Sequence, residues 1–146
     1  MNRRSLLAGT AGCLAGLLAG CSGTEPNGNG TTPSTETPTP GETTFRVVDA
    51  YCRSSPGGAS VSFGDGSVTI HGRVEAPNGC YTAVLDSVQW EDETLVVRVE
   101  SAQRDVDACV QCLYAIEYEA SVRFEGDGPA RVDVIHDGDR VASVTR

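Results

Sequence analysis

The residues with the greatest chemical potential in this sequence are two cysteines separated by two positions, Cys109 and Cys112. Such a pair is typical of thioredoxin-like redox centres and of zinc sites. A redox centre requires its first cysteine at the N-terminus of a helix, whereas the residues after Cys112 alternate as in a strand. A zinc site usually takes a second close pair, but Cys52 and Cys80 stand alone. A redox or metal-handling role for Cys109 and Cys112 is therefore the alternative hypothesis.

Two disulfide bonds are the preferred interpretation of these four cysteines, because small exported domains are commonly crosslinked in this way. Four cysteines allow three connectivities. If Leu95 pairs with Trp90 across the acidic segment 91–94, position i faces about position 185 − i, so Cys80 lies opposite roughly residue 105. We therefore predict the pair Cys80–Cys109, which leaves Cys52–Cys112. From loop-closure entropy these bonds contribute about 3.5 and about 4 kcal/mol.

No other group of residues suggests catalysis. His71 and His136 are the only histidines, and their places near the ends of predicted strands favour surface or rim positions. The sequence has no Gly-x-Ser-x-Gly, no His-Glu-x-x-His and no phosphate-binding glycine loop. The Asp-Gly pairs at 65–66, 127–128 and 137–138 lack the spacing of a calcium loop and are explained as turns. We predict that the protein is not an enzyme and has no catalytic residue, metal or cofactor.

The first 21 residues have the features of a targeting signal. Arg3 and Arg4 precede an apolar run over 5–20, which is short for a spanning helix of roughly 20 residues and fits a secretory signal. The arginine pair is typical of the twin-arginine export class. The run ends in Leu-Ala-Gly-Cys, where small residues flank a cleavage site and a thiol follows. We predict a signal peptide over 1–20 and a lipid-modified Cys21, with an uncleaved anchor helix as the alternative.

The charge balance of the chain is acidic. Removal of the signal peptide leaves 9 arginines against 20 Asp and Glu, a formal net charge of −11, and there is no lysine. This balance argues against nucleic-acid binding, which requires a basic surface, and against a flat position on anionic lipid. It is typical of halophilic surfaces, where salt at about 1 M screens charge repulsion beyond roughly 3 Å. A mesophilic acidic protein with biased codon usage is the alternative.

Residues 21–44 are predicted to be a tether. After Cys21 the segment consists of Thr, Pro, Gly, Ser, Glu and Asn, and it has no large apolar side chain to bury. This composition predicts disorder between the lipid and the folded part. Asn29-Gly30-Thr31 is an N-glycosylation sequon, which makes Asn29 a candidate glycosylation site.

The remaining residues, 45–146, have the length of one small domain. Apolar and polar residues alternate most regularly from Leu113 to Glu125, and Asp65-Gly66 between two β-rich runs is typical of a hairpin. The predicted strands are 45–50, 60–63, 67–75, 80–90, 95–101, 113–125, 130–136 and 140–144. This pattern predicts an all-β domain, either a small antiparallel sandwich or a partly open barrel, stapled by two disulfides.

Several of these features together resemble a group of haloarchaeal twin-arginine-exported lipoproteins of uncharacterised function. They are the arginine pair, the lipobox, the Thr/Pro tether, the lysine-free acidic domain and the runs 78–88, 108–109 and 116–124. In that group a recurrent cysteine pair matches Cys80 and Cys109, whereas Cys52 and Cys112 look like an addition. A weaker similarity, over about residues 79–120, is to the C-terminal domain of bacterial protease-complex-stability lipoproteins. It implies an accessory role through protein contacts.

Taken together, the sequence predicts a non-catalytic, lipid-anchored binding or accessory module on the extracytoplasmic face of the cell membrane. Its expected partners are the membrane, through the lipid on Cys21, and another envelope protein, but no nucleic acid. A structural envelope component is a further hypothesis beside the redox or metal-handling one. The prediction rests on the export signal and on the lack of convergent chemical groups.

Overall fold

The computed structural model describes residues 40–53 and 56–146, and these residues form eight strands and no helix. The strands are β1 (Pro40–Cys52), β2 (Gly58–Gly64), β3 (Ser67–Ala76), β4 (Tyr81–Glu91), β5 (Thr94–Gln103), β6 (Tyr114–Phe124), β7 (Arg131–His136) and β8 (Asp139–Thr145). All except β1 coincide with predicted strands to within two residues at either end.

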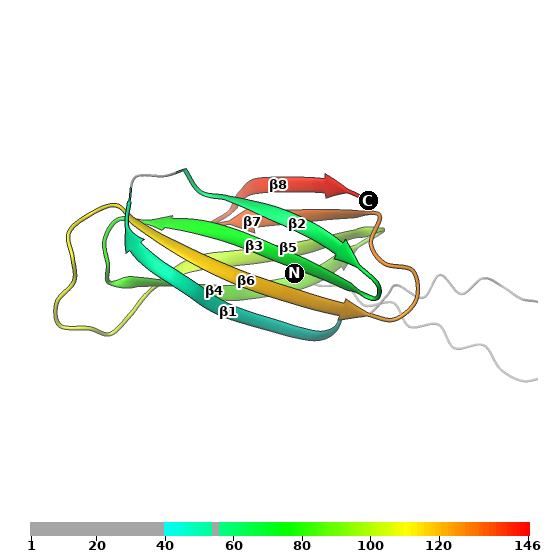
Figure 1. Cartoon of the computed structure of the whole chain (residues 1–146), viewed down its shortest axis with the longest axis horizontal. Helices are drawn as coiled ribbons and strands as arrows, with labels where there is room; N and C mark the ends of the chain where they lie inside the picture. The colour runs from blue at the N-terminus through cyan, green and yellow to red at the C-terminus, as the bar shows by residue number, and fades with distance from the viewer. Residues whose placement is uncertain (1–39, 54–55) are drawn as a thin grey trace, which may run out of the picture. The chain divides into compact units, whose positions relative to one another are not determined.

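The strands form two sheets of four that pack face to face (Figure 1). Sheet A has the order β1-β6-β3-β2 and is antiparallel throughout. Sheet B has the order β4-β5-β7-β8, and its central pair, β5 and β7, is parallel. The chain enters β7 only after it has crossed to sheet A to form β6. The predicted all-β sandwich is confirmed, and the sheets do not close into a barrel.

The core lies between the two sheets and follows from the alternation seen in the sequence. On β6 the inward positions are buried, while Glu117 and Glu119 between them face outward. Sheet B supplies a second set of buried aliphatic residues. The fully buried members are Val68, Ile70, Ile116, Ala120, Val122, Leu95, Val97, Val99, Val132 and Val134. Removal of these apolar surfaces from water is the main force that holds the sheets together.

A buried hydrogen bond also joins the two sheets. Tyr118 Oη on β6 lies 2.6 Å from Nε2 of His136, at the end of β7, and both side chains are buried. Gly72, opposite Tyr118, leaves room for the ring, since a Cβ there would clash with it. The predicted surface or rim position is therefore wrong for His136, although His71 is exposed. Burial lowers the pKa of His136 and raises that of Tyr118, so both groups stay neutral near pH 7.

The two ends of the sandwich differ. β1 runs the whole length of sheet A, so its first residue lies at one end and its last residue at the other. Pro40 pairs with Phe124, close to the two-residue turns of the β2–β3 and β4–β5 hairpins (Figure 1). We call this the turn end. Cys52 pairs with Tyr114, close to the connection 77–80 and to the long loop 104–113. We call this the stapled end.

One predicted boundary is wrong. The sequence predicts a disordered tether up to residue 44, but β1 begins at Pro40, and residues 40–44 belong to sheet A. Thr43 is half-buried opposite Val122, and Thr44 pairs with Ser121. Threonine favours strands, and the backbone of β6 needs hydrogen-bond partners along this stretch. Pairing with β6 therefore extends the strand where no large apolar residue signals it.

Candidate functional site

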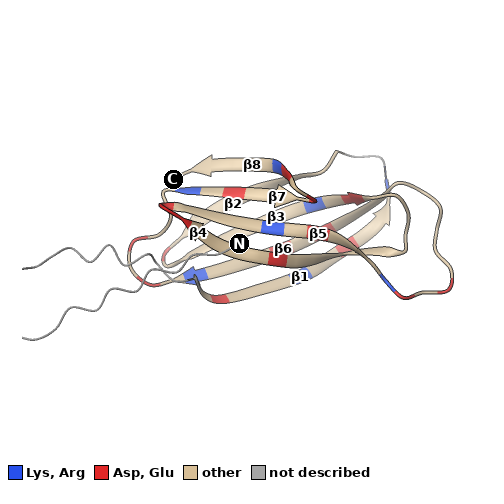
Figure 2. Ribbon diagram, turned by 180° about the vertical axis from the view of Figure 1, so that it is seen from behind, with Lys and Arg blue, Asp and Glu red and all other residues tan. Residues whose placement is uncertain are grey.

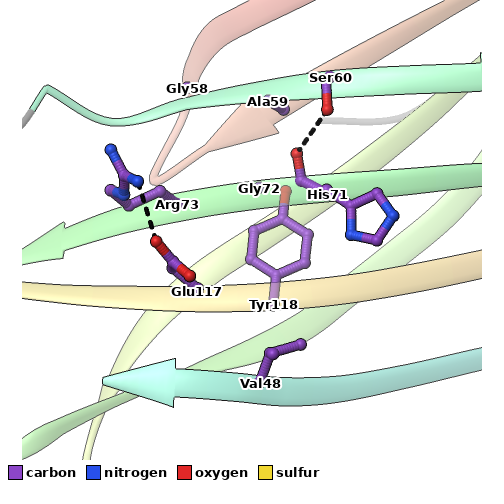
Figure 3. A pocket seen from close by; sticks show the side chains of 9 residues that line it. All are labelled: Val48, Gly58, Ala59, Ser60, His71, Gly72, Arg73, Glu117 and Tyr118. Atoms are coloured by element: carbon purple, nitrogen blue, oxygen red, sulfur yellow. Dashed lines mark hydrogen bonds and ion pairs between the residues drawn. The ribbon is translucent and has the colours of Figure 1, made fainter. Parts of the chain in front are cut away.

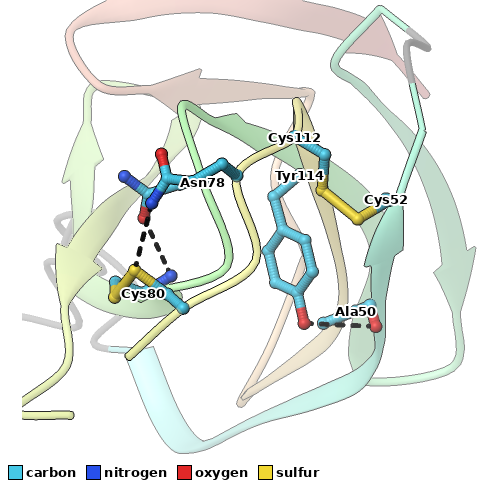
Figure 4. The surroundings of a disulfide bond; sticks show 8 residues. Ala50, Cys52, Asn78, Cys80, Cys112 and Tyr114 are labelled. Carbon is cyan, nitrogen blue, oxygen red and sulfur yellow. Dashed lines mark hydrogen bonds between the residues drawn. A yellow bond between two sulfur atoms is a disulfide. The ribbon is translucent and has the colours of Figure 1, made fainter. Parts of the chain in front are cut away.

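The stapled end contains both disulfide bonds. Cys52, the last residue of β1, bonds to Cys112, with 5.7 Å between their Cα atoms (Figure 4). Cys80, just before β4, bonds to Cys109, with 5.1 Å between the Cα atoms. The hairpin register predicts the Cys80–Cys109 pair, and Cys52–Cys112 is the pair that this prediction leaves. Cys109 and Cys112 therefore belong to different disulfides rather than to one CxxC disulfide.

The register of the β4–β5 hairpin explains the Cys80–Cys109 bond. Trp90 pairs with Leu95 as predicted, and a bulge at Asp86 then shifts the pairing by one residue. As a result the carbonyl of Cys80 accepts a hydrogen bond from the amide of Arg104, at 2.7 Å. The side-chain oxygen of Asn78 accepts the Cys80 amide at 2.9 Å (Figure 4). Cys80 is thus fixed beside the start of the loop that carries Cys109.

The loop of residues 104–113, which we call the stapled loop, crosses from sheet B to sheet A. Beyond its disulfides it is held by backbone hydrogen bonds to neighbouring segments. The Gly79 amide donates to the Val110 carbonyl at 2.9 Å, and the Arg53 amide donates to the Leu113 carbonyl at 3.0 Å. The Arg104 guanidinium donates to the Gly79 carbonyl at 2.8 Å. The loop lacks helix and strand but is fixed at both its beginning and its end.

Despite this support, the stapled loop exposes apolar side chains. Val106, Val110 and Leu113 are 42%, 59% and 54% exposed. Among the described residues only three other large apolar side chains are classed as exposed, namely Val47, Val48 and Val84. Half of this exposed set therefore lies in one ten-residue loop, next to the exposed carboxylates of Asp105 and Asp107. Exposed apolar side chains on a rigid support are characteristic of protein contacts.

A second feature is a pocket of about 340 Å³ on the outer side of sheet A (Figure 3). Residues from four strands line it: Val48, Gly58, Ala59, Ser60, His71, Gly72, Arg73, Glu117 and Tyr118. Arg73 Nη2 lies 2.9 Å from Glu117 Oε1, and the Tyr51 hydroxyl donates to the same oxygen at 2.5 Å. Small residues on β2 and β3 leave the space between these polar groups.

The charges at the pocket are already paired. The hydrogen bond from Tyr51 and that from Arg73 lower the pKa of Glu117, so this carboxylate stays ionised and is a weak proton acceptor. The same bond to Glu117 raises the pKa of Tyr51. Arg46 pairs with Glu119 on the neighbouring part of the face at 3.0 Å. Figure 2 shows basic and acidic positions interspersed along the strands. The pocket is thus a polar depression between satisfied ion pairs.

Metal ligands do not converge in the part of the chain that the structure describes. Over 40–53 and 56–146 there is no group of three or more His, Cys, Asp or Glu placed to hold a metal ion. Asp137, in an Asp-Gly turn, accepts the Ser101 amide at 2.8 Å and so has a structural partner. Within the same ranges no helix is long and apolar enough to cross a membrane.

The predicted signal peptide (1–20), the lipid-modified Cys21 and the candidate glycosylation site Asn29 lie outside the described residues. Comparison of the chain with the known protein families, with curated proteins and with solved structures found no match.

The sequence predicts the disulfides but not the exposed apolar residues of the stapled loop. A partial signal was present, because Val106 and Val110 fall between the predicted strands 95–101 and 113–125 and so have no predicted core position, whereas Leu113 is the first residue of the second of these strands. The pocket gave no such signal, since its small residues look like ordinary strand positions.

Proposed function

We propose that the protein is a non-catalytic, lipid-anchored binding or accessory module of the cell envelope, which docks another envelope protein through the stapled loop. The observation that carries the proposal is the exposure of Val106, Val110 and Leu113 on a loop held by two disulfides. The lipobox at Cys21 and the export signal supply the location.

Pre-organisation is the first argument for docking at this loop. Binding usually costs free energy because loops must be ordered at the interface. Here the disulfides and the backbone bonds from Gly79 and Arg53 have already ordered it. A partner that covers Val110 and Leu113 then gains the hydrophobic contribution, about 25 cal/mol per Å² of apolar surface, with little ordering cost.

The position of the loop is the second argument. The segment that leads to Cys21 joins the domain at Pro40, at the turn end, and the stapled loop lies at the other end of β1 (Figure 1). A partner at the stapled end therefore binds at the opposite end of β1 from the point where that segment attaches. Asp105 and Asp107 flank Val106, so the expected partner surface has an apolar centre with basic or neutral groups at its rim.

Site-specific photocrosslinking in the native membrane tests this proposal. A photoreactive amino acid replaces Val110 in one strain and Val84, an equally apolar exposed residue on β4, in another. We expect a discrete crosslinked adduct from position 110 and none of the same mass from position 84. Identical patterns from both positions, or no adduct from position 110, would contradict docking through the loop.

Substitution provides the quantitative control. The variant Val106→Ser/Val110→Ser/Leu113→Ser should abolish co-purification of the crosslinked partner, because it removes the apolar surface without changing the disulfides. The matched variant Val47→Ser/Val48→Ser/Val84→Ser removes the other three exposed apolar side chains and should retain the partner. Equal loss of the partner in both variants would indicate nonspecific hydrophobic association instead of a specific contact.

Thiol alkylation separates this proposal from the redox or metal-handling alternative. In protein isolated without reductant, Cys52, Cys80, Cys109 and Cys112 should not react before reduction and should all react after it. Rapid alkylation of Cys109 and Cys112, or a bound zinc or copper ion, would favour the alternative. A structural envelope component predicts oxidised cysteines and no discrete adduct.

A further inference from the structure

In the described part of the chain four strands lie at sheet edges, and of these β2 alone lacks the usual protection against pairing. Proteins usually block edge strands with charges, proline or bulges, because free backbone groups pair with other chains. β1 has charged residues and two register shifts, β4 has a bulge at Asp86, and β8 begins with Asp139-Arg140 and has a register shift against β7. β2 has none of these devices, although the chain contains 20 acidic residues.

The sequence of β2 is Gly58-Ala-Ser-Val-Ser-Phe-Gly64. It contains no charge and no proline, and its pairing with β3 is regular over all seven residues. Ala59, Val61 and Phe63 are half-buried toward the core, while Ser60 and Ser62 are exposed on the outer face. An uncharged edge of this kind is a ready template for one more strand.

The register shows which backbone groups are free. Gly64 and Ser67 flank the two-residue turn and form a hydrogen-bonded pair, and hydrogen-bonded and non-bonded pairs alternate from there. The amides and carbonyls of Ala59, Val61 and Phe63 therefore point away from β3. Within the described part of the chain, no other segment forms a backbone hydrogen bond with them.

We propose that β2 pairs with β2 of a second copy of this chain, antiparallel about a two-fold axis at Val61. The strand is nearly palindromic around that residue: Ser60 faces Ser62 of the second copy, Ala59 faces Phe63, and Gly58 faces Gly64. An isologous interface of this kind needs such a self-complementary patch. The proposal is independent of the partner proposed for the stapled loop.

The symmetry also satisfies packing and hydrogen bonding. Each opposed pair points to the same face of the joined sheet, so apolar residues meet apolar residues and serines meet serines. A small side chain meets a large one at Ala59 and Phe63, which avoids a clash. The backbone amides and carbonyls of the two Ala59–Phe63 pairs and of the Val61–Val61 pair form six hydrogen bonds between the copies. The four strands of sheet A in each copy then form one sheet of eight strands.

Disulfide trapping tests the register. In the proposed dimer residue 60 lies directly opposite residue 62 of the second copy. The two copies of residue 60 lie diagonally across the interface, at roughly 7–8 Å from each other, which is too far for easy disulfide formation. The full chain is prepared in detergent as Ser60→Cys and as Ser62→Cys, and the variants are oxidised separately and after mixing. We expect linked dimers mainly in the mixture, with peptide mapping that identifies a bond between positions 60 and 62.

The outcomes are distinct. Equal linkage in the separate and mixed samples would overturn the proposed register, and no linkage in any sample, together with a monomer mass by sedimentation, would overturn the dimer. A non-thiol control uses Ala59→Pro, which removes an amide that faces the free edge. It should weaken association by at least about tenfold and leave the fold intact. A dimer of unchanged affinity in this variant would also contradict the proposal.

The control for Ala59→Pro is Ser60→Pro, one residue further along β2. Its amide points to β3, so this substitution should weaken the fold itself. A loss of the dimer with retained thermal stability is therefore expected only for Ala59→Pro.

Discussion

The two ends of the sandwich differ in how most of their strands are connected. At the turn end, two-residue turns connect strands that are neighbours in both sequence and sheet, and residues with positive φ, Gly66 at 71° and Asp92 at 55°, make them tight. The stapled end has one such turn, Asp137-Gly138 between β7 and β8, but there the chain also passes between sheets through ten residues without regular structure, and both disulfides lie there.

The difference shows which connections are ordered by residues close in sequence and which need contacts from elsewhere in the chain. A tight turn needs only a residue that tolerates the left-handed region, since the flanking strands supply the hydrogen bonds. The stapled loop connects strands that do not pair with each other, and it buries few of its side chains. Its order therefore depends on the crosslinks together with the backbone hydrogen bonds from Gly79 and Arg53, and that order pre-organises its exposed apolar residues for the proposed partner.

Removal of the disulfides should have the largest effect. Cys52→Ser/Cys112→Ser opens a link across 60 residues and should lower the free energy of unfolding by about 4 kcal/mol, whereas Cys80→Ser/Cys109→Ser opens one across 29 residues and should cost about 3.5 kcal/mol. Chemical denaturation of the oxidised chain measures both values. Losses below about 1 kcal/mol would mean that the stapled end does not depend on its crosslinks.

Hydrogen exchange sharpens the same comparison. In the Cys52→Ser/Cys112→Ser variant, the amide of Arg53, which bonds to Leu113, should lose its protection. The amide of Phe124, which bonds to Gly66 at the turn end, should keep it. A uniform loss at both ends would show that the two ends unfold as one unit.

The hydrogen bond between Tyr118 and His136 should have an intermediate effect. Tyr118→Phe leaves the buried Nε2 of His136 without a partner and should cost about 1–3 kcal/mol. The double variant Tyr118→Phe/His136→Leu removes both polar groups and should recover most of that loss. Thermal denaturation of the two variants and the wild type measures the difference.

The same pair predicts a pH dependence. Burial lowers the pKa of His136 in the folded state below its ordinary value of 6.5, with Asp137 acting in the opposite direction. The unfolded chain then binds a proton that the folded chain does not. The stability due to neutral His136 should be complete above pH 6.5 and should be lost as the pH falls toward the lowered folded-state pKa. A wild-type profile parallel to that of the double variant would contradict this assignment.

The smallest effect is expected at the turn end. Gly66→Ala places a side chain at a φ of 71° and should cost roughly 1–2 kcal/mol, because the left-handed region is unfavourable for alanine. The new Cβ would only contact the Phe124 carbonyl at 3.7 Å, so the cost comes from the backbone. Gly58→Ala, which has open space and no positive φ, is the control and should change stability little.

The strands and the disulfide pairing followed from local patterns. Alternation over 113–125 predicted β6, and the turn between Trp90 and Leu95 set the register that brought Cys80 toward Cys109. Both depend on residues that are close in sequence or on one hairpin. Such information is contained in a single chain without knowledge of its tertiary contacts.

Features that depend on distant contacts were not predictable in this way. Nothing near Pro40 in the sequence indicates that β6 extends far enough to pair with it. The parallel pairing of β5 and β7 depends on the passage of β6 through the other sheet. The hydrogen bond of buried His136 depends on Tyr118 from the opposite sheet, and on Gly72, which makes room for that ring. The pocket likewise needs four strands to be placed before it exists.

The Cys52–Cys112 bond has a mechanical consequence. β1 directly follows residues 1–39, which include the predicted lipid site. Its other end, at Cys52, is bonded covalently to the stapled loop. A pull on Pro40 against a load held at Leu113 would travel along β1, through the two sulfur atoms and directly into the loop. The core would carry little of that tension. The force would then pass through β1 and the disulfide, and the rest of the sandwich would lie outside the path that bears it.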